Sequence, residues 1–340
     1  MKKTGQFDIL KIISILMVLV LHYFNKSYGG GLNDSITFNG ILTHSLESIC
    51  IIACNLFVLI TSWFMVDTKS IKLKKIFNIL IILVFYNIVI YGICVLTGYV
   101  KLNSDSLKSF INTITNCWFV IIYLILYILI PFINKGLEKF NKKEVFNLLV
   151  IMLIFFSIYP TFLTNVTVKD GGYGIINFIT LYIAIYYIKK YLNNKSFKTY
   201  LLFLIFIFST IITIVLSYKS MRLWNYNSIF VITASISLFM LFTRFEIKRN
   251  KFITYIASFS LATYIIHSNM FIVRDLYCEI FKSDYYSHTN LLPINLLISI
   301  IGIFIGCIII EIIRRFIFKY SIDKFVSKFK IYNKTIELAK

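Results

Sequence analysis

The chain has 340 residues, of which 59% are hydrophobic, and its mean hydropathy is +0.81. This composition excludes an ordinary soluble globular protein, in which roughly half of the residues are apolar. The formal net charge of +20 would suit a nucleic-acid-binding protein, but the 35 lysines and arginines lie between apolar segments, where they usually report membrane topology. We therefore expect an integral membrane protein without a nucleic-acid partner.

Ten apolar segments approach the length of about 20 residues that a helix needs to cross roughly 30 Å of hydrocarbon. Only three prolines occur, and the apolar runs are continuous rather than alternating, which favours helices over a β-barrel. The predicted fold class is all-α, a polytopic membrane helix bundle with about ten transmembrane helices. In chain order the predicted spans are 7–27, 46–66, 76–98, 117–134, 145–165, 174–192, 199–218, 227–243, 252–273 and 291–313.

The basic residues alternate between the two sides of this predicted bundle. Twenty-six lie before the first span, in every second loop or after the last span, whereas eight lie in the opposite loops. The positive-inside rule then places both termini in the cytoplasm. We expect one membrane domain over 1–340, with spans at about 7–316 and a short basic cytoplasmic tail at 317–340. The expected location is the cell membrane, crossed several times.

The first span carries a stripe of polar residues. Lys11 and His22 are eleven residues apart, which is three helical turns plus about 20°, so both point the same way about 16 Å apart. Asp8 and Ser14 lie on the same face. Ionisable groups at such depth cost about 2.5 kcal/mol or more and usually face a bundle interior or a wet cavity. Alternatively, Lys11 snorkels to the cytoplasm or pairs with Asp8, and His22 has only a structural role.

A second histidine, His267, lies in the ninth span about 22 Å from its cytoplasmic start, at a depth similar to that of the first-span histidine. Tyr264 lies one turn below it on the same face. This coincidence favours a cavity shared by the two histidines, while a simple cap of the outer part of the span remains the alternative. His44 and His288 fall in predicted external loops and are expected to be solvated.

Polar and aromatic residues of other spans have simpler interpretations. Asn55 and Ser62 in the second span more often hold helices together than bind a substrate. Trp118, at an outer helix end, suits an interfacial anchor. The six cysteines show no metal-ligand spacing, so no metal site is expected, and Cys117 and Cys278 lie near the ends of outer loops where they could pair.

Together these residues resemble the motifs of a known family. Asp8-Ile9-Leu10-Lys11, followed by ten residues and His22, resembles the basic-X10-His motif that opens the acyltransferase family 3 membrane proteins. Further similar stretches are Asn55–Ser62, Trp118-Phe119 with Tyr123, Tyr127, Pro131 and Asn134, and Tyr264–His267. Gly172-Tyr173-Gly174 before Leu181-Tyr182, and Tyr226-Asn227-Ser228, resemble the branch assigned to bacterial surface-polysaccharide modification. The resemblance covers nearly the whole chain.

The resemblance implies a membrane-bound O-acyltransferase. Such an enzyme takes an acetyl or short acyl group from acyl-coenzyme A on the cytoplasmic side and delivers it to a hydroxyl of a cell-envelope polysaccharide or lipid-linked glycan. Acetyl-coenzyme A or another acyl-coenzyme A is then a donor substrate rather than a tightly bound cofactor. The expected partners are this donor, the glycan acceptor, the lipid bilayer and, as candidates, other membrane proteins of glycan synthesis.

The family motifs also imply roles for individual residues. Lys11 would help to hold the anionic coenzyme near the inner mouth, and His22 and His267 would be the catalytic residues, with His22 as general base or transient acyl carrier. This chain has Lys11 where arginine is usual, which keeps the charge but loses the planar fork that binds phosphate. The residues expected to bind substrate or support the site are Asp8, Ser14, Asn55, Ser62, Trp118 and Tyr264.

Two other functions remain open at the level of sequence. A polar path through ten helices also suits a polysaccharide or small-molecule transporter, although no inverted repeat and no pair of broken helices is visible. The third hypothesis is a non-catalytic subunit of a glycan-synthesis complex, in which the two histidines are only packed. The sequence does not specify the acyl group, the acceptor glycan, the oligomeric state or the choice between direct transfer and an acyl-histidine intermediate.

Overall fold

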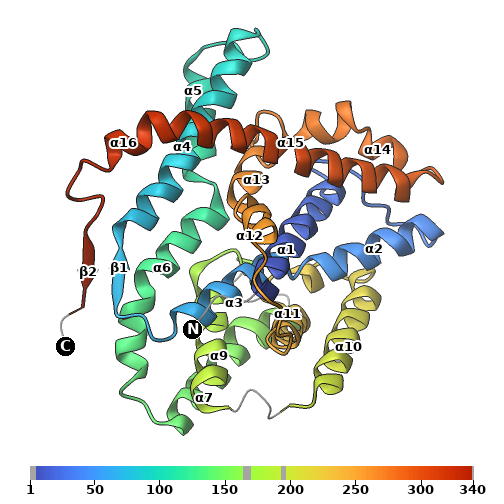
Figure 1. Ribbon diagram of the computed structural model, residues 1–340. Helices are drawn as coiled ribbons and strands as arrows, with labels where there is room; N and C mark the ends of the chain where they lie inside the picture. Colours follow the sequence, from blue (N-terminus) through green and yellow to red (C-terminus); the bar gives the residue numbers. More distant parts are fainter. Residues whose placement is uncertain (1–4, 164–169, 193–196, 339–340) are drawn as a thin grey trace.

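The computed structural model describes residues 5–163, 170–192 and 197–338, and these residues are mainly helical, with two short strands (Figure 1). The predicted all-α class is confirmed. The topology prediction also used five basic residues that lie outside the described part of the chain, namely Lys2, Lys3, Lys169, Lys195 and Lys340.

Short segments of other helix types occur within and between the predicted spans. Within the described residues, π-helical turns occur at Ile154–Ile158 and Asp275–Ile280, and a 3-10 turn occurs at Met221–Trp224. In chain order the regular elements are α1 (Gly5–Phe24), α2 (Phe38–Cys50), α3 (Ala53–Met65), β1 (Ser70–Lys72), α4 (Leu73–Leu96), α5 (Ser104–Thr115), α6 (Trp118–Leu137), α7 (Lys142–Leu153), α8 (Tyr159–Phe162), α9 (Ile175–Tyr191), α10 (Thr199–Ser217), α11 (Ile229–Phe242), α12 (Lys251–Ala257), α13 (Ser260–His267), α14 (Ser283–Tyr286), α15 (Leu292–Tyr320), α16 (Ile322–Val326) and β2 (Thr335–Glu337).

Eight helical segments of the described chain are long and apolar enough to cross a membrane. The two other predicted spans are helical but shorter. α9 has 17 residues, and the ninth span is divided between α12 and α13. The protein is therefore a multi-pass membrane protein whose apolar segments all form helices, because each segment must satisfy its backbone hydrogen bonds internally.

Polar side chains mark where several helices begin. Asn141 accepts from the backbone N–H groups of Lys143 and Glu144 before α7, and the Glu144 carboxylate accepts from the Asn141 N–H in return. Asn103 forms a similar capping box before α5. Because such caps satisfy N–H groups that have no partner inside the helix, they determine where these helices start.

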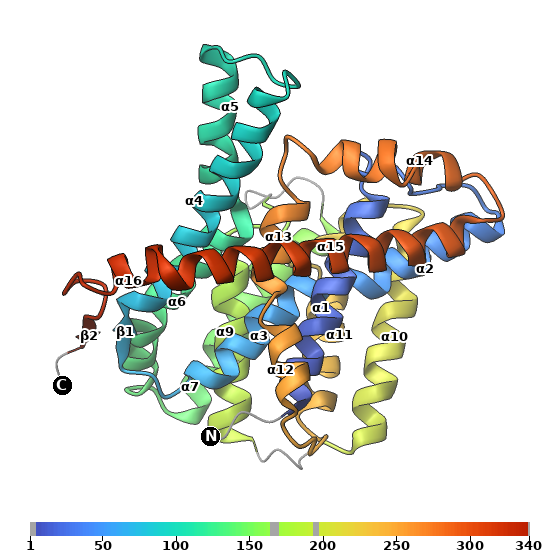
Figure 2. The same cartoon turned by 45° about the horizontal axis from the view of Figure 1, so that its top comes forward.

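Helix α1 occupies the centre of the bundle. It contacts α2, α3, α11, α12, α13 and α15, and its Leu10, Ile15 and Leu19 are fully buried. α15 crosses one side of the bundle, and α4 and α5 project beyond the other helices (Figure 2). Large apolar residues are exposed along α10 and α15, as expected for surfaces that face lipid.

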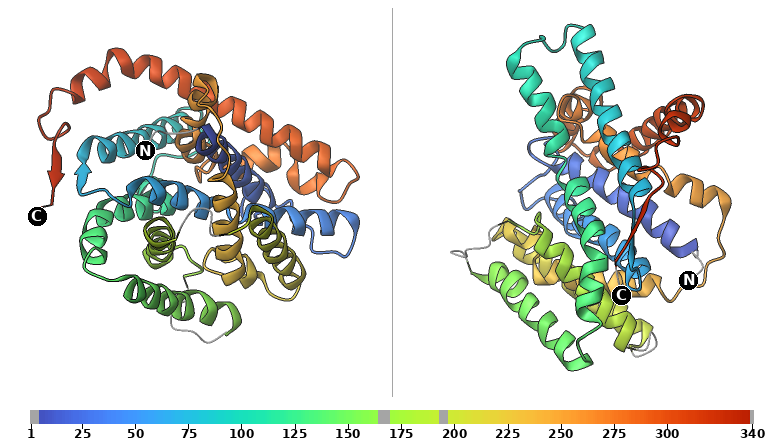
Figure 3. Two further views of the ribbon diagram at one scale, coloured as in Figure 1. Left: turned by 60° about the horizontal axis from the view of Figure 1, so that its bottom comes forward. Right: turned by 90° about the vertical axis from the view of Figure 1, so that its left-hand side faces the viewer.

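The C-terminal segment returns to the start of α4 (Figure 1, Figure 3). β2 pairs antiparallel with β1, with Ser70 opposite Glu337 and Lys72 opposite Thr335. The Tyr332 hydroxyl donates to Asn78 Oδ1 at 2.6 Å. The tail therefore contacts a loop that the distribution of basic residues places on the same side of the membrane.

One sequence prediction is wrong. His44 is not solvated, because α2 begins at Phe38 and carries it into the bundle, where it is 2% exposed and its ring stacks on Tyr218 at 3.9 Å. Cys117 and Cys278 are both free, and the Cys278 thiol donates to the Tyr28 carbonyl oxygen. His288 is exposed, as predicted.

Candidate active site

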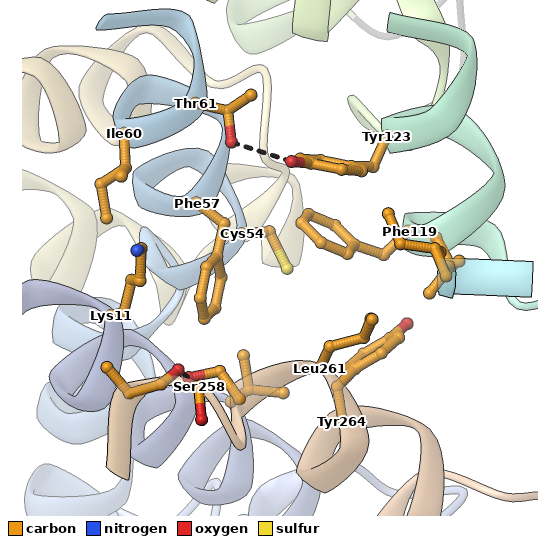
Figure 4. Close-up of a pocket in the computed structure, with 15 residues that line it drawn as sticks. Lys11, Cys54, Phe57, Ile60, Thr61, Phe119, Tyr123, Ser258, Leu261 and Tyr264 are labelled. Carbon is orange, nitrogen blue, oxygen red and sulfur yellow. Dashed lines mark hydrogen bonds between the residues drawn. The ribbon is translucent and has the colours of Figure 1, made fainter. Parts of the chain in front are cut away.

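A cavity of 220 Å³ lies between α1, α3, α6 and the α12–α13 segment, and we call it the central cavity (Figure 4). Most of its lining is apolar, including Phe57, Phe119 and Leu261. The lining residues with polar or charged side-chain groups are Lys11, Cys54, Thr61, Tyr123, Ser258, Ser260 and Tyr264. An apolar space with a few placed polar groups is typical of a small-molecule site.

Lys11 lines the central cavity from α1 and also forms the ion pair that the sequence allowed. Its Nζ lies 3.4 Å from Asp8 Oδ1, and Asp8 Oδ2 accepts a hydrogen bond from the Thr254 hydroxyl at 2.7 Å. Asp8 is almost fully buried, whereas the Lys11 side chain is about one-third exposed. Asp8 therefore links α1 to α12 and holds the lysine beside the cavity.

A second cation lies near the same cavity. The Thr61 hydroxyl donates to the Tyr123 hydroxyl oxygen at 3.2 Å, as Figure 4 shows. Lys75 Nζ lies 5.2 Å from the centre of the Tyr123 ring and 4.2 Å from that of Tyr127. In the sequence, Lys75 is one of the 26 basic residues counted for topology. The overlooked signal was a lysine at a helix start facing the aromatic residues of the fourth span.

The two histidines, whose similar depths favoured a shared cavity, lie in direct contact, although neither lines the central cavity. The ring centroids of His22 and His267 are 4.8 Å apart, although the residues belong to α1 and α13. His267 Nδ1 lies 2.5 Å from the Thr263 carbonyl oxygen. Because a carbonyl only accepts, Nδ1 carries the proton and Nε2 keeps its lone pair in the neutral ring.

Each of these rings has a buried nitrogen without a hydrogen-bond partner within the described residues, Nδ1 of His22 and Nε2 of His267. Leaving a buried polar group unpaired costs about 1–3 kcal/mol, so two such atoms in adjacent rings indicate a site that a ligand completes. Tyr28 covers the His22 ring with centroids 4.9 Å apart. Burial raises the pKa of Tyr28, so its hydroxyl remains protonated at neutral pH.

Neither histidine lines the central cavity, whose lining reaches Tyr264. Tyr264 lies one helical turn below His267, with ring centroids 6.2 Å apart. A ligand that fills the cavity as far as Tyr264 is therefore about one turn, roughly 5 Å, short of the histidine pair along α13.

A charged network holds the break in the ninth span. The Arg315 guanidinium donates to the Ser258 hydroxyl and carbonyl oxygens, both at 2.8 Å, and lies over the Phe259 ring at 4.3 Å. Arg315 and Arg314 both donate to the Glu311 carboxylate. This network was not predicted from the sequence. The sequence feature that indicates it is a single acidic residue, Glu311, three and four residues before two arginines in α15. The network orients the start of α13, the helix that carries Tyr264 and His267.

Two predicted supporting residues bond within their own helices. The Ser14 hydroxyl donates to the Leu10 carbonyl at 2.8 Å, and Ser62 donates to the Val58 carbonyl at 2.7 Å. These bonds satisfy each hydroxyl within its own helix, so neither side chain joins two helices.

Asn55 and Trp118 contact other helices instead. Asn55 Nδ2 donates to the Tyr226 carbonyl at 2.9 Å and to Ser235 Oγ at 3.3 Å, while its Oδ1 accepts from Asn177 at 3.3 Å. The Trp118 ring stacks on Tyr226 with centroids 5.4 Å apart. Asn55 therefore joins α3, α9 and the α11 region, which is the role of a residue that holds membrane helices together.

A family model described as an acyltransferase domain matches residues 5–312, which is nearly the whole chain. No curated protein and no solved structure gave a significant match.

Proposed function

Because this chain belongs to the acyltransferase family 3 of membrane proteins, we propose a specific reaction for it. As a member of that family it is a membrane acyltransferase. In our proposal it moves an acetyl or short acyl group from acyl-coenzyme A on the cytoplasmic side of the cell membrane to a hydroxyl of a cell-envelope polysaccharide or lipid-linked glycan. The supporting observation is the histidine pair, with its two unpartnered nitrogens, one turn beyond a cavity that has a lysine in its wall.

The central cavity suits the acyl thioester. Phe57, Phe119 and Leu261 offer apolar surface to the acyl chain and the sulfur, while Lys11 adds a positive charge. An anionic donor would lie with its charged part toward Lys11, which Asp8 holds in place. Lys11 lacks a planar fork, so in this proposal it attracts the donor as a point charge.

The proposed transfer has one acid–base step. An imidazole nitrogen of the histidine pair takes the proton of the acceptor hydroxyl, and the hydroxyl oxygen forms a bond to the acyl carbon. The carbon–sulfur bond breaks, and the imidazolium returns the proton to the thiolate that leaves. In this proposal His22 is the base, and the adjacent His267, whose Nδ1 is held by the Thr263 carbonyl, orients the His22 ring.

The experiment is acyl transfer from radiolabelled acetyl-coenzyme A to envelope glycans in inside-out membrane vesicles. We expect His22→Ala to reduce transfer by about 100-fold or more, as is typical for loss of a general base, and His267→Ala to reduce it as well. His288→Ala is the matched control, because that histidine is exposed. Normal transfer by His22→Ala would remove the catalytic assignment, and glycan movement without any acyl donor would favour a transporter.

A further inference from the structure

Two hollows continue the central cavity toward the side of the membrane that the positive-inside rule assigns to the cytoplasm. The basic hollow, of 330 Å³, is lined by Lys74, Asn78, Arg314, Arg315, Ser327 and Tyr332 among others. The connecting hollow, of 420 Å³, shares Lys74 and Asn78 with the basic hollow. It also shares Ile79 and Leu261 with the central cavity. The shared residues make the three spaces neighbours in one row.

The charges along this row are positive. Lys74 and Lys75 extend from α4, and the described part of the chain shows no ion pair for either. Glu311 is an acidic residue beside the basic hollow, and it is shared between Arg314 and Arg315. The two guanidinium groups therefore exceed the carboxylate that holds them by one positive charge.

The basic hollow is also a built space. Arg314 is largely buried, and Glu311 binds it through both Nε and Nη2, at 2.7 and 2.6 Å, which fixes the plane of its guanidinium. The C-terminal segment closes the opposite wall, since Tyr332 donates to Asn78 and its ring lies 5.5 Å from Lys74 Nζ. A guanidinium of fixed orientation beside a lysine is an arrangement that recognises phosphate.

We propose that the basic hollow binds the phosphate groups of the acyl donor, with the rest of the donor extending through the connecting hollow into the central cavity. This inference rests on the proposed function. Leu261, at the shared wall, is six residues before His267, or about 9 Å along the helix, so a donor that enters there approaches the histidine pair. Arg314 adds a guanidinium whose Nη1 group is not among the atoms that bind Glu311.

An anionic lipid headgroup offers the same phosphate chemistry to this hollow. The two sources differ in what is attached, because the donor places a thioester in the central cavity and a lipid does not. Two measurements therefore distinguish the donor from a lipid. One is the binding of a donor fragment that has no phosphates, and the other is binding in a bilayer of different lipid composition.

The test measures binding of coenzyme A and of S-acetyl-pantetheine, which has no phosphate, to the purified full chain in nanodiscs. Lys74→Gln is the main variant because this lysine is exposed, and Lys139→Gln is the control because Lys139 is exposed and lines none of the three spaces. We expect Lys74→Gln to weaken coenzyme A binding about tenfold and to leave S-acetyl-pantetheine binding unchanged. Arg314→Gln should weaken coenzyme A binding further than Lys74→Gln does.

Suppose that the wild-type protein binds coenzyme A and transfers acetyl groups. An unchanged coenzyme A affinity in Lys74→Gln would then overturn this inference and leave the proposed function intact. A wild-type protein that neither binds coenzyme A nor transfers acetyl groups would overturn both. Variants that lose binding of phosphatidylglycerol but keep coenzyme A affinity would assign the hollow to a lipid headgroup instead.

Discussion

Glu311 is the residue whose substitution should most disturb the helix that carries Tyr264 and His267. It is 1% exposed, and its carboxylate accepts two bonds from Arg314 at 2.7 and 2.6 Å, one from Arg315 at 2.7 Å and one from the Tyr86 hydroxyl at 2.5 Å. In Glu311→Gln one oxygen becomes an NH2 group, which donates and therefore opposes the donors that surround it. The two arginines then keep their charge without a counter-ion.

Removing one partner from a buried ion pair typically costs about 3–5 kcal/mol, because the remaining charge stays desolvated. For a chain of this size that loss corresponds to a fall in Tm of about 4–7 °C. Tyr86→Phe should cost less, about 1.5–3 kcal/mol, because it removes one of the four bonds to the carboxylate. Acyl transfer should fall in Glu311→Gln even below its melting temperature, since Arg315 also holds Ser258 at the start of α13.

The assay is thermal unfolding of the purified protein in one detergent, followed by acyl transfer at a temperature where each variant is folded. Glu138→Gln is the matched control, because Glu138 pairs with Lys69 at 3.5 Å but is 41% exposed, and such surface pairs contribute about 0–1 kcal/mol. If Glu311→Gln and Glu138→Gln lower Tm equally, the buried network does not stabilise the bundle in the way we argue.

Three further outcomes follow from the geometry. Lys11→Gln should raise KM for the acyl donor about tenfold with a smaller change in kcat, because the variant lacks the positive charge that attracts the donor. Steady-state kinetics in vesicles would measure both constants. Asn55→Leu should lower the free energy of unfolding by about 1–3 kcal/mol, measured as a fall in Tm against the exposed control Asn112→Leu, because its partners on α9 and α11 lose their bonds. The hydrogen bond from Lys190 holds the pKa of Asp67 below its usual value. The ionised Asp67 therefore stabilises the folded protein at pH values above the ordinary carboxyl pKa, and this stabilisation is lost as the pH falls through the lowered pKa. Asp67→Asn should remove that part of the acid dependence of Tm, and an unchanged pH profile would contradict the assignment.

Local chemistry was sufficient to predict much of the fold. Each apolar segment forms a helix because its backbone has no other hydrogen-bonding partner in lipid, and this requirement acts within the segment itself. The common face of Lys11 and His22 follows from helical geometry alone. For the same reason the sequence indicated that His267 and His22 reach similar depths.

The arrangement between helices was decided only by the tertiary structure. Lipid is about as apolar as leucine, so hydropathy does not distinguish a helix face that meets lipid from one that meets another helix. His44 was wrongly expected in solvent because α2 begins at Phe38, ahead of the predicted span, and carries it into the bundle. The break between α12 and α13, which Arg315 satisfies from far along the chain, was not visible in the hydropathy either. The 4.8 Å contact of the two histidines and the basic hollow beside α15 likewise depend on packing between distant segments, which no local pattern encodes.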